Sequence, residues 1–309
     1  MPHGILVIDK PRGPTSHDVV GRVRKALGTR AVGHAGTLDP MATGVLVIAL
    51  GEATKLMPWL THHDKVYSAR IALGLETDTC DAWGVETRRL ETSPELREAL
   101  CASKRGEAVS LLATALDAER NRSAQIPPAY SAIHFNGERA YERARRGEIS
   151  DLAPRPVAVY GLTLVDCCDD PPSLTVTAHV SKGYYVRALA RDLGAGLRTF
   201  GHLIDLRRIR SGAFSLEGAA AIDASPEALR NALVPLAEAA SRTLPVARLT
   251  GVGADDARQG RSVSRDHIDV PAHAPCAWLD PSGCLVAVGQ FDEDGRGRVI
   301  RGFCASGET

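Results

Sequence analysis

Apolar positions recur along the chain with both helical and strand spacing, which predicts a mixed α/β protein. Residues 45–50 form a continuous apolar run that is typical of a fully buried strand. Val19, Val20, Val23 and Leu27 follow helical spacing after Ser16, which is a suitable helix cap. Similar patterns predict strands at 4–9, 66–73, 130–135, 157–167, 174–181 and 203–209, and a second helix at 52–61. Because helices do not alternate strictly with strands, the order favours a mixed or antiparallel sheet over a doubly wound one.

The pattern changes from about residue 236, where Gly, Pro and Asp become frequent. Short strands are predicted at 277–279, 285–290 and 298–303, which indicates a small β-rich module. The boundary falls within 236–248. We therefore predict a main domain over residues 1–240 and a second domain over residues 248–309.

Composition is that of a cytoplasmic enzyme without metal or disulfides. A chain of 309 residues is long enough for two domains with a sizeable core. Its seven cysteines include no Cys-x-x-Cys pair, and Cys276, Cys284 and His273 do not have zinc-site spacing. The N-terminus has no basic segment followed by a long apolar run, so we expect no signal peptide. The longest apolar run is too short to span a bilayer.

The net charge is zero, but the charges are segregated along the chain. Residues 1–30 carry six Lys/Arg against two acids, and residues 182–210 carry seven against two. Residues 76–119 are acidic, and four arginines (139, 143, 145 and 146) lie in a helix-like segment near 138–147. Such segregation is compatible with a positive face for a phosphate backbone, or with ordinary solvated helix faces.

Residues 33–44 place one carboxylate in a constrained loop. Glycines at 33, 36 and 44 permit unusual backbone angles, and Pro40 pushes Asp39 toward an extended conformation. Asp39 is our candidate nucleophile; the alternative is a structural turn in which Asp39 bonds nearby N–H groups. A phosphate-binding loop would need Gly-Lys-Ser/Thr, and an aspartyl-phosphate enzyme would need an acid where Met41 stands.

Several segments together resemble the bacterial tRNA pseudouridine-55 synthase family (TruB), in that family's order. The matching segments are 9–16 (DKPRGPTS), 33–40 (GHAGTLDP), 65–67 (KVY), 125–132 (QIPPAYSA) and 181–187 (SKGYYVR). They cover most of residues 4–215, and the tail matches only loosely. The resemblance implies the mixed or antiparallel sheet of the pseudouridine synthases, a C-terminal PUA-like RNA-binding domain, and a reaction that needs no cofactor or metal.

The resemblance assigns Asp39 as the nucleophile that acts while uracil is detached, rotated and rejoined through C5. Arg187 matches the arginine that pairs with this acid; a nearby cation keeps a carboxylate ionised in a dry pocket. Gly183 is a natural break between strand and helix, so Arg187 is expected in the first helical turn. Without the motif, Arg187 would be an ordinary surface arginine.

Four further residues take roles from the same resemblance. Tyr67 matches the tyrosine that stacks on the target base and takes the C5 proton. Tyr185 matches a second pocket tyrosine, and if helical it would point about 200° away from Arg187. Leu206 matches an apolar residue that lines the uracil pocket, and His34 matches the histidine that fills the space left by the flipped base.

The implied substrate is uridine 55 in the T-loop of tRNA, bound through the T-arm stem-loop. We expect a monomer that needs no protein partner and does not bind a membrane. Two alternatives stay open: a noncatalytic RNA-binding or tRNA-chaperone protein on the same scaffold, and a guide-RNA-dependent synthase. The chain departs from the family pattern at Glu119, Asn121 and His134, which leaves the role of the 90–125 connection open.

Overall fold

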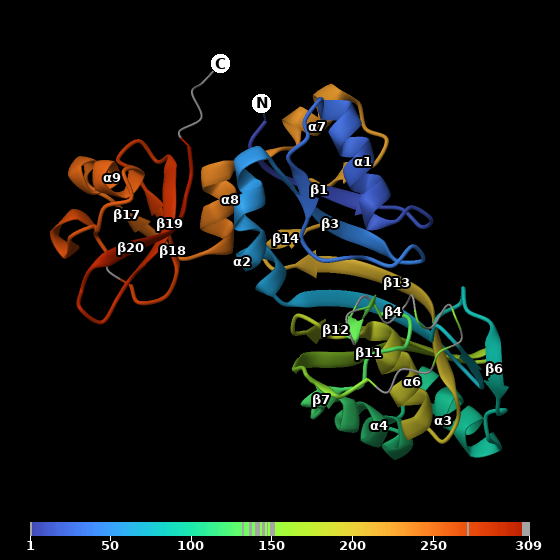
Figure 1. The fold of residues 1–309 in the computed structure, drawn as a ribbon. Coiled ribbons are helices and arrows are strands. Elements are labelled where there is room, and N and C mark those ends of the chain that lie inside the picture. The colour runs from blue at the N-terminus through green and yellow to red at the C-terminus, as the bar shows by residue number, and fades with distance from the viewer. Residues whose placement is uncertain are drawn as a thin grey trace. The chain divides into compact units, whose positions relative to one another are not determined.

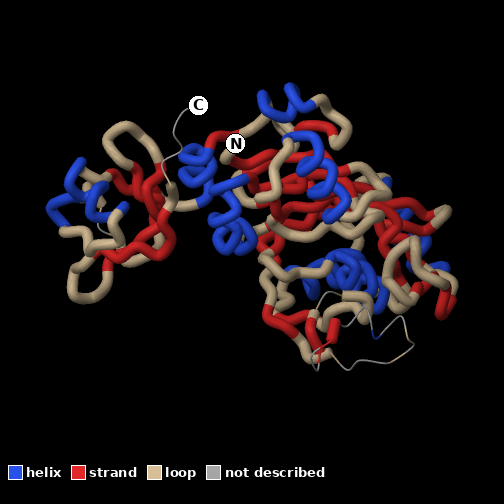
Figure 2. The backbone as a smooth tube through the Cα atoms, turned by 45° about the horizontal axis from the view of Figure 1, so that its top comes forward, coloured by secondary structure: helices blue, strands red, loops and turns tan. Residues whose placement is uncertain are grey.

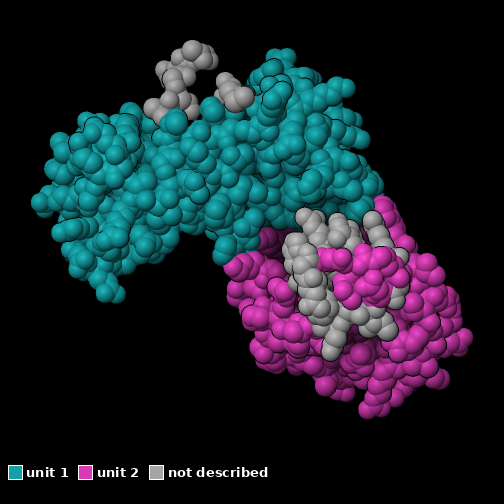
Figure 3. Space-filling model, viewed as in Figure 1, with its two compact units in different colours: residues 1–40, 44–63, 211–309 teal, residues 41–43, 64–210 magenta. Residues whose placement is uncertain are grey.

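The computed structural model describes residues 2–131, 133–135, 138–139, 143, 146, 148, 152–270 and 272–304. The chain divides into two compact units, coloured separately in Figure 3. Unit 1 comprises residues 1–40, 44–63 and 211–309, and unit 2 comprises residues 41–43 and 64–210. This division differs from the one predicted from sequence, because unit 1 contains both N-terminal segments and all residues from 211 onward. The separation into domains 1–240 and 248–309 stays a prediction.

Unit 1 begins with a small sheet in which β1 is central. Strand β1 pairs antiparallel with β3 and parallel with β15, so the sheet is mixed, as predicted. The elements of this part are β1 (Gly4–Lys10), α1 (Ser16–Leu27), β2 (Val32–His34), β3 (Thr43–Leu50), η1 (Gly51–Leu56), α2 (Met57–His62), β14 (Phe214–Ser215), β15 (Ala220–Ala221), α7 (Pro226–Asn231), β16 (Val234–Pro235) and α8 (Leu236–Thr243). The helix predicted at 52–61 therefore starts as a 3₁₀ turn and becomes α-helical only at Met57, beside Pro58.

The C-terminal part of unit 1 contains the predicted short strands. They form a four-stranded sheet in the order β17-β18-β19-β20 (Figure 1). Its elements are β17 (Val246–Arg248), α9 (Gly251–Arg258), η2 (Arg265–His267), β18 (Cys276–Leu279), β19 (Leu285–Phe291) and β20 (Gly297–Gly302). Trp278 and Phe291 pack at the centre of this part, which is thus a small β-rich module with its own core.

A second apolar core joins this module to the first sheet. Ile5 and Val47 of the first sheet share one buried cluster with Leu279, Val288 and Phe303. Two polar contacts add to the connection. Lys55 Nζ donates to Gly302 O, and Cys304 N donates to the carboxylate of Glu52. The tail is therefore packed onto the N-terminal sheet and is more than a tethered appendage.

The long strands of unit 2 are hydrogen-bonded in the order β11-β12-β4-β13. Helices α3 and α4 contact β11, and α6 contacts β4 and α4. Figure 1 labels these three helices, and Figure 2 shows helices in blue and strands in red. The elements of unit 2 are β4 (Lys65–Leu73), β5 (Leu75–Thr77), β6 (Glu86–Arg89), α3 (Pro94–Lys104), α4 (Ser110–Arg120), β7 (Ala124–Gln125), β8 (His134–Phe135), β9 (Glu138–Arg139), β10 (Arg155–Pro156), β11 (Val159–Asp169), β12 (Pro172–Val180), α6 (Val186–Gly196) and β13 (Gly201–Ser211). Four of its five predicted strands are confirmed to within a few residues, while 130–135 is a strand only at β8.

The segment near 138–147 agrees with the predicted basic helix at Arg143, which is helical, and differs from it at residues 138–139, which form strand β9. Arg146 lies in a turn and pairs with Glu138 and Glu148. Arg145 lies outside the described residues, as does Ala132 of the 125–132 motif. The ion pairs reduce the positive charge that this segment presents.

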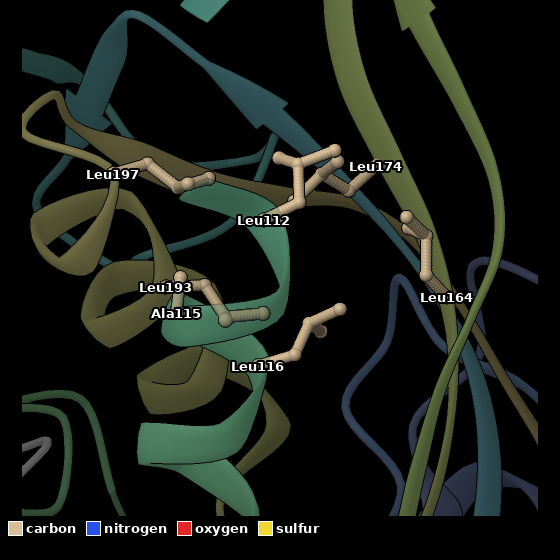
Figure 4. A pocket seen from close by; sticks show the side chains of 7 residues that line it. All are labelled: Leu112, Ala115, Leu116, Leu164, Leu174, Leu193 and Leu197. Carbon is tan, nitrogen blue, oxygen red and sulfur yellow. The ribbon is translucent and has the colours of Figure 1, made fainter. Parts of the chain in front are cut away.

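Helix α4 packs against α6 and the sheet of unit 2 through apolar side chains. These are Leu112, Ala115, Leu116, Leu164, Leu174, Leu193 and Leu197 (Figure 4). Because the space between them has no room for a water molecule and no polar group to orient a ligand, we interpret it as ordinary packing of the helices on the sheet. No helix among the described residues is long and apolar enough to cross a membrane.

Candidate active site

Asp39 lies in the connection between β2 and β3, within unit 1. The two strands pair antiparallel, with His34 opposite Ile48. Gly36 and Gly44 have φ of 96° and 97°, which favours glycine at both positions. Gly33 needs no such freedom, because it lies in β2 opposite Ala49. Asp39 itself is half-buried, so its carboxylate sits on a loop anchored in the core.

The segment 10–16 holds the backbone on both sides of Asp39. The Ser16 hydroxyl accepts from Leu38 N at 2.9 Å and donates to Leu38 O at 3.1 Å. On the other side, Gly13 N donates to Pro40 O at 2.8 Å, and Lys10 Nζ lies 3.4 Å from the same oxygen. Because each neighbour of Asp39 is bonded to this segment, the position of the carboxylate depends on more than the glycines and proline of its own loop.

Two residues of this segment act differently from the sequence prediction. The cap of α1 is Thr15, which forms a capping box with Asp18, and not Ser16. This leaves the buried Ser16 hydroxyl available to Leu38. Lys10 is fully buried, and its ammonium also donates to the carbonyls of Pro11 and Pro14 at 2.9 and 2.8 Å. Its charge is thereby compensated by carbonyl dipoles, although the sequence alone had indicated only a packing residue behind the loop.

His34 is the second candidate residue in unit 1. It ends β2 and is half-buried, and its ring makes an edge contact with that of His17, with centroids 5.3 Å apart and planes at 82°. His17 is an exposed residue in the first turn of α1. The pair places two imidazole rings beside the loop that carries Asp39.

Arg187 lies in the first turn of α6 in unit 2, as predicted, and its side chain is almost fully buried. Nη1 donates to Thr79 O at 3.0 Å and Nη2 donates to Tyr130 O at 2.9 Å. Nε lies 3.8 Å from an oxygen of Asp81, another buried residue. A cation at the positive end of a helix is unfavourable by itself, and these carbonyls and this carboxylate offset the cost. The guanidinium is therefore held in a fixed position at the start of α6.

The start of α6 is fixed by Gln125. The side-chain amide of Gln125 accepts from Tyr185 N at 2.8 Å and donates to Tyr185 O at 3.1 Å, and it is nearly fully buried. Tyr185 is the N-cap and has an extended backbone. The predicted angle of about 200° between Tyr185 and Arg187 is therefore wrong, because it assumed that both residues are helical. The amide pairing sets where the helix, and hence Arg187, begins.

Tyr67 and Leu206 lie on strands of unit 2. Tyr67 is buried in β4 opposite Ala178, on the same face as Lys65 and Ala69. Leu206 is buried in β13, and its carbonyl accepts from the Thr43 hydroxyl at 3.3 Å. Both side chains are thus held by the sheet and not by a loop.

The buried Lys65 makes the stability of unit 2 depend on pH. Burial above all, with repulsion from Arg208, lowers the pKa of Lys65 to about 8, although Asp64 opposes the shift. An unfolded chain keeps this proton up to a higher pH, near 10.5, so the free energy of unfolding should rise with pH between about 8 and 10.5. We expect Lys65→Met to lose this rise, which amounts to up to about 3 kcal/mol. Urea unfolding of both proteins at about pH 7.5 and about pH 10 measures it; equal rises in both would contradict it.

The candidate residues are divided between the units. Asp39 and His34 belong to unit 1, whereas Tyr67, Tyr185, Arg187 and Leu206 belong to unit 2. Within unit 2, Tyr185 and Arg187 are adjacent at the start of α6. That all six residues meet in one pocket stays a prediction, as does the convergence of the basic segments. No group of three or more His, Cys, Asp or Glu side chains that could hold a metal lies in the described part of the chain.

Three supporting residues were not recognised from sequence. The role of Ser16 was detectable, because Thr15 and Asp18 have capping-box spacing and this frees Ser16 for another bond. Gln125 lies in the 125–132 motif, but its partner, 60 residues away, could not be read from the sequence, and Asp81 gave no signal for its partner 106 residues away. Glu119, a departure from the family pattern, is buried and ion-paired with Arg122, so this part of the 90–125 connection serves packing.

Comparisons with known proteins agree on one family. The model of the TruB family pseudouridylate synthase N-terminal domain matches residues 24–186. A protein of Thermobifida fusca (strain YX) named tRNA pseudouridine synthase B is 43% identical over 302 residues, covering 96% of this chain and 93% of the relative. A protein of the same name from Synechococcus sp. (strain CC9311) is 42% identical over 311 residues, covering 99% of both.

Solved structures show the same fold. A chain in an H/ACA ribonucleoprotein bound to a substrate RNA containing 2′-deoxyuridine has a TM-score of 0.69 and 22% identity, covering 98% of this chain and 86% of that chain. A chain in a Cbf5-Nop10-Gar1 complex has a TM-score of 0.68 and 23% identity, covering 98% and 84%. The predicted fold with its C-terminal PUA-like sheet is thus confirmed, and on the sequence matches this chain belongs to the TruB family of pseudouridylate synthases.

Proposed function

We propose that this enzyme isomerises uridine 55 to pseudouridine in the T-loop of tRNA, with Asp39 as the nucleophile. The observation that carries the proposal is the set of hydrogen bonds from segment 10–16 to both neighbours of Asp39. Such bonds orient a carboxylate for attack at no cost during the reaction. The names of the relatives support tRNA as the substrate.

The proposed reaction balances without a redox partner. The N1–C1′ bond breaks, uracil rotates, C5 bonds to C1′, the C5 proton is removed and N1 gains a proton. Asp39 acts at C1′ or at C6, or abstracts a proton to give a glycal. Tyr67 stacks on the flipped base, and its phenol oxygen accepts the C5 proton as the phenol's own proton passes on toward N1. The buried Arg187 is the cation that pairs with the carboxylate of Asp39.

His34, Tyr185 and Leu206 complete the proposed substrate site. Leu206 supplies an apolar wall for uracil, Tyr185 a second aromatic ring, and His34 fills the space that the flipped base leaves in the RNA. The enzyme acts as a cytoplasmic monomer without a protein partner. Relatives of over 40% identity are named tRNA pseudouridine synthase B, which favours this function over a guide-RNA-dependent one.

The substrate test compares a T-arm stem-loop with a linear oligonucleotide of the same sequence. We expect conversion of the stem-loop only, because a flipped loop base needs a folded RNA around it, and weaker binding as salt rises. Carbodiimide-dependent primer-extension stops at position 55 measure the product. Equal conversion of both RNAs would overturn the T-loop assignment, and binding without any conversion would favour the noncatalytic alternative.

A further inference from the structure

The turn between β5 and β6 exposes a tryptophan. Trp83 is 53% exposed and Val85 is 72% exposed, whereas Trp278 is buried and Trp59 is partly buried. A large aromatic ring that an ordered turn holds in solvent offers its face to a planar partner, and covering that face would remove apolar surface from water. Two exposed apolar side chains make a surface far too small for a stable protein interface, which needs about 1,000 Å². The surface that these two side chains form is about large enough for one planar group, such as a single ring system, to lie on it.

The turn that carries Trp83 is held in a specific shape. Asp78 and Val85 bond across it, with Asp78 Oδ1 accepting from Val85 N at 2.8 Å and Asp78 N donating to Val85 O at 3.0 Å. A Cβ at Gly84 would lie 2.3 Å from the Thr79 hydroxyl oxygen, so only glycine fits there. Cys80 has φ of 58°, a conformation that is costly for a side chain with a Cβ. The backbone of Trp83 is therefore fixed before any ligand binds.

The same turn contacts Arg187. Asp81 Oδ1 accepts from Trp83 N at 3.0 Å, and Asp81 Oδ2 lies 3.8 Å from Arg187 Nε. Thr79 O accepts directly from Arg187 Nη1 at 3.0 Å. The carboxylate of Asp81 therefore links the backbone of Trp83 to the guanidinium of Arg187. The turn directs a carboxylate inward to the arginine and an indole outward to solvent.

We propose that Trp83 stacks on an unpaired nucleobase of the RNA substrate, next to the nucleotide bound at Arg187. The inference rests on the proposed function and adds a substrate contact to it. A base stacks on an aromatic ring with little sequence preference, and loop nucleotides of folded RNA present such faces. Arg89 on β6 is exposed and pairs with the exposed Glu86; because such surface pairs are weak, a phosphate can compete for its guanidinium.

The test compares Trp83→Ala and Trp83→Tyr in the full-length protein with the T-arm stem-loop. We expect Trp83→Ala to raise the Kd about 5- to 150-fold, and Trp83→Tyr to restore most of the affinity. The single-turnover rate at saturating RNA should stay within about twofold of wild type. Stacking on a neighbouring base stabilises the bound substrate and the transition state equally, so its loss weakens binding without slowing the reaction. Tyr160→Ala is the matched control, because Tyr160 is an equally exposed aromatic on strand β11 of the same unit.

Tryptophan fluorescence gives a readout that does not depend on activity. Stem-loop RNA should quench the emission of wild type, and Trp83→Tyr should lose that quenching although Trp59 and Trp278 remain. If wild type converts RNA but Trp83→Ala binds normally and no quenching is seen, the inference fails and the proposed function stands. A slower rate at unchanged Kd would assign Trp83 to the support of Arg187 and also overturn the inference. If wild type neither binds nor converts the stem-loop, both the inference about Trp83 and the proposed function are wrong.

Discussion

Asp39→Asn should abolish pseudouridine formation while leaving RNA affinity and folding almost unchanged. Asparagine keeps the shape of aspartate but lacks the negative charge, and the bonds that hold this loop come from the backbone of Leu38 and Pro40. The loop should therefore keep its conformation. We expect the single-turnover rate to fall by about 10⁴-fold or more, as for loss of a nucleophile in other enzymes. Carbodiimide primer extension on a T-arm stem-loop measures the product.

Asp223→Asn is the control for this variant, because Asp223 is an exposed aspartate in the same unit. It should behave as wild type. The Kd of Asp39→Asn for the stem-loop, measured by filter binding, should stay within about threefold of wild type. Product formation by folded Asp39→Asn at the wild-type rate would show that Asp39 is structural and would refute the proposed mechanism.

Arg187→Met should lose most activity, for an electrostatic reason. Without the guanidinium, a carboxylate in a dry pocket would tend to protonate, and we expect the rate to fall about 10²- to 10³-fold. The variant also leaves Asp81 and the carbonyls of Thr79 and Tyr130 without their donor, so its melting temperature should fall as well. Stopped-assay rates below the melting temperature of each variant separate the two effects.

One further variant separates charge from packing at this position, and a variant of a neighbouring arginine serves as its control. Arg187→Lys keeps a cation but cannot reproduce the fork of donors, so it should fold better than Arg187→Met and recover only part of the rate. Arg191→Met is the matched control, since Arg191 lies one turn along α6 and donates to Ile126 O at 3.0 Å. It should retain near-wild-type activity. Full activity in Arg187→Met would contradict a role for Arg187 in catalysis.

The sequence by itself determined most of the elements and the family to which the chain belongs. Periodicity in 45–50 and in 174–181 is a local property, because burial of one face selects strand or helix spacing; both strands are present. The order of strands and helices favoured a mixed sheet over a doubly wound one, and the sheet is mixed. The motifs also identified the TruB family and, through Gly183 and the apolar spacing after it, placed Arg187 in the first turn of a helix.

The tertiary structure alone decided what holds those residues. Segment 10–16 bonds to Leu38 and Pro40, Gln125 bonds to the backbone of Tyr185, and Asp81 lies beside Arg187. Periodicity reports only which side of an element is buried, so it contains no information about partners tens of residues away. The extended backbone of Tyr185 and the packing of the tail onto the first sheet depend on the same long-range contacts. Local preferences specified the elements, and contacts between distant segments specified the positions of the side chains that act.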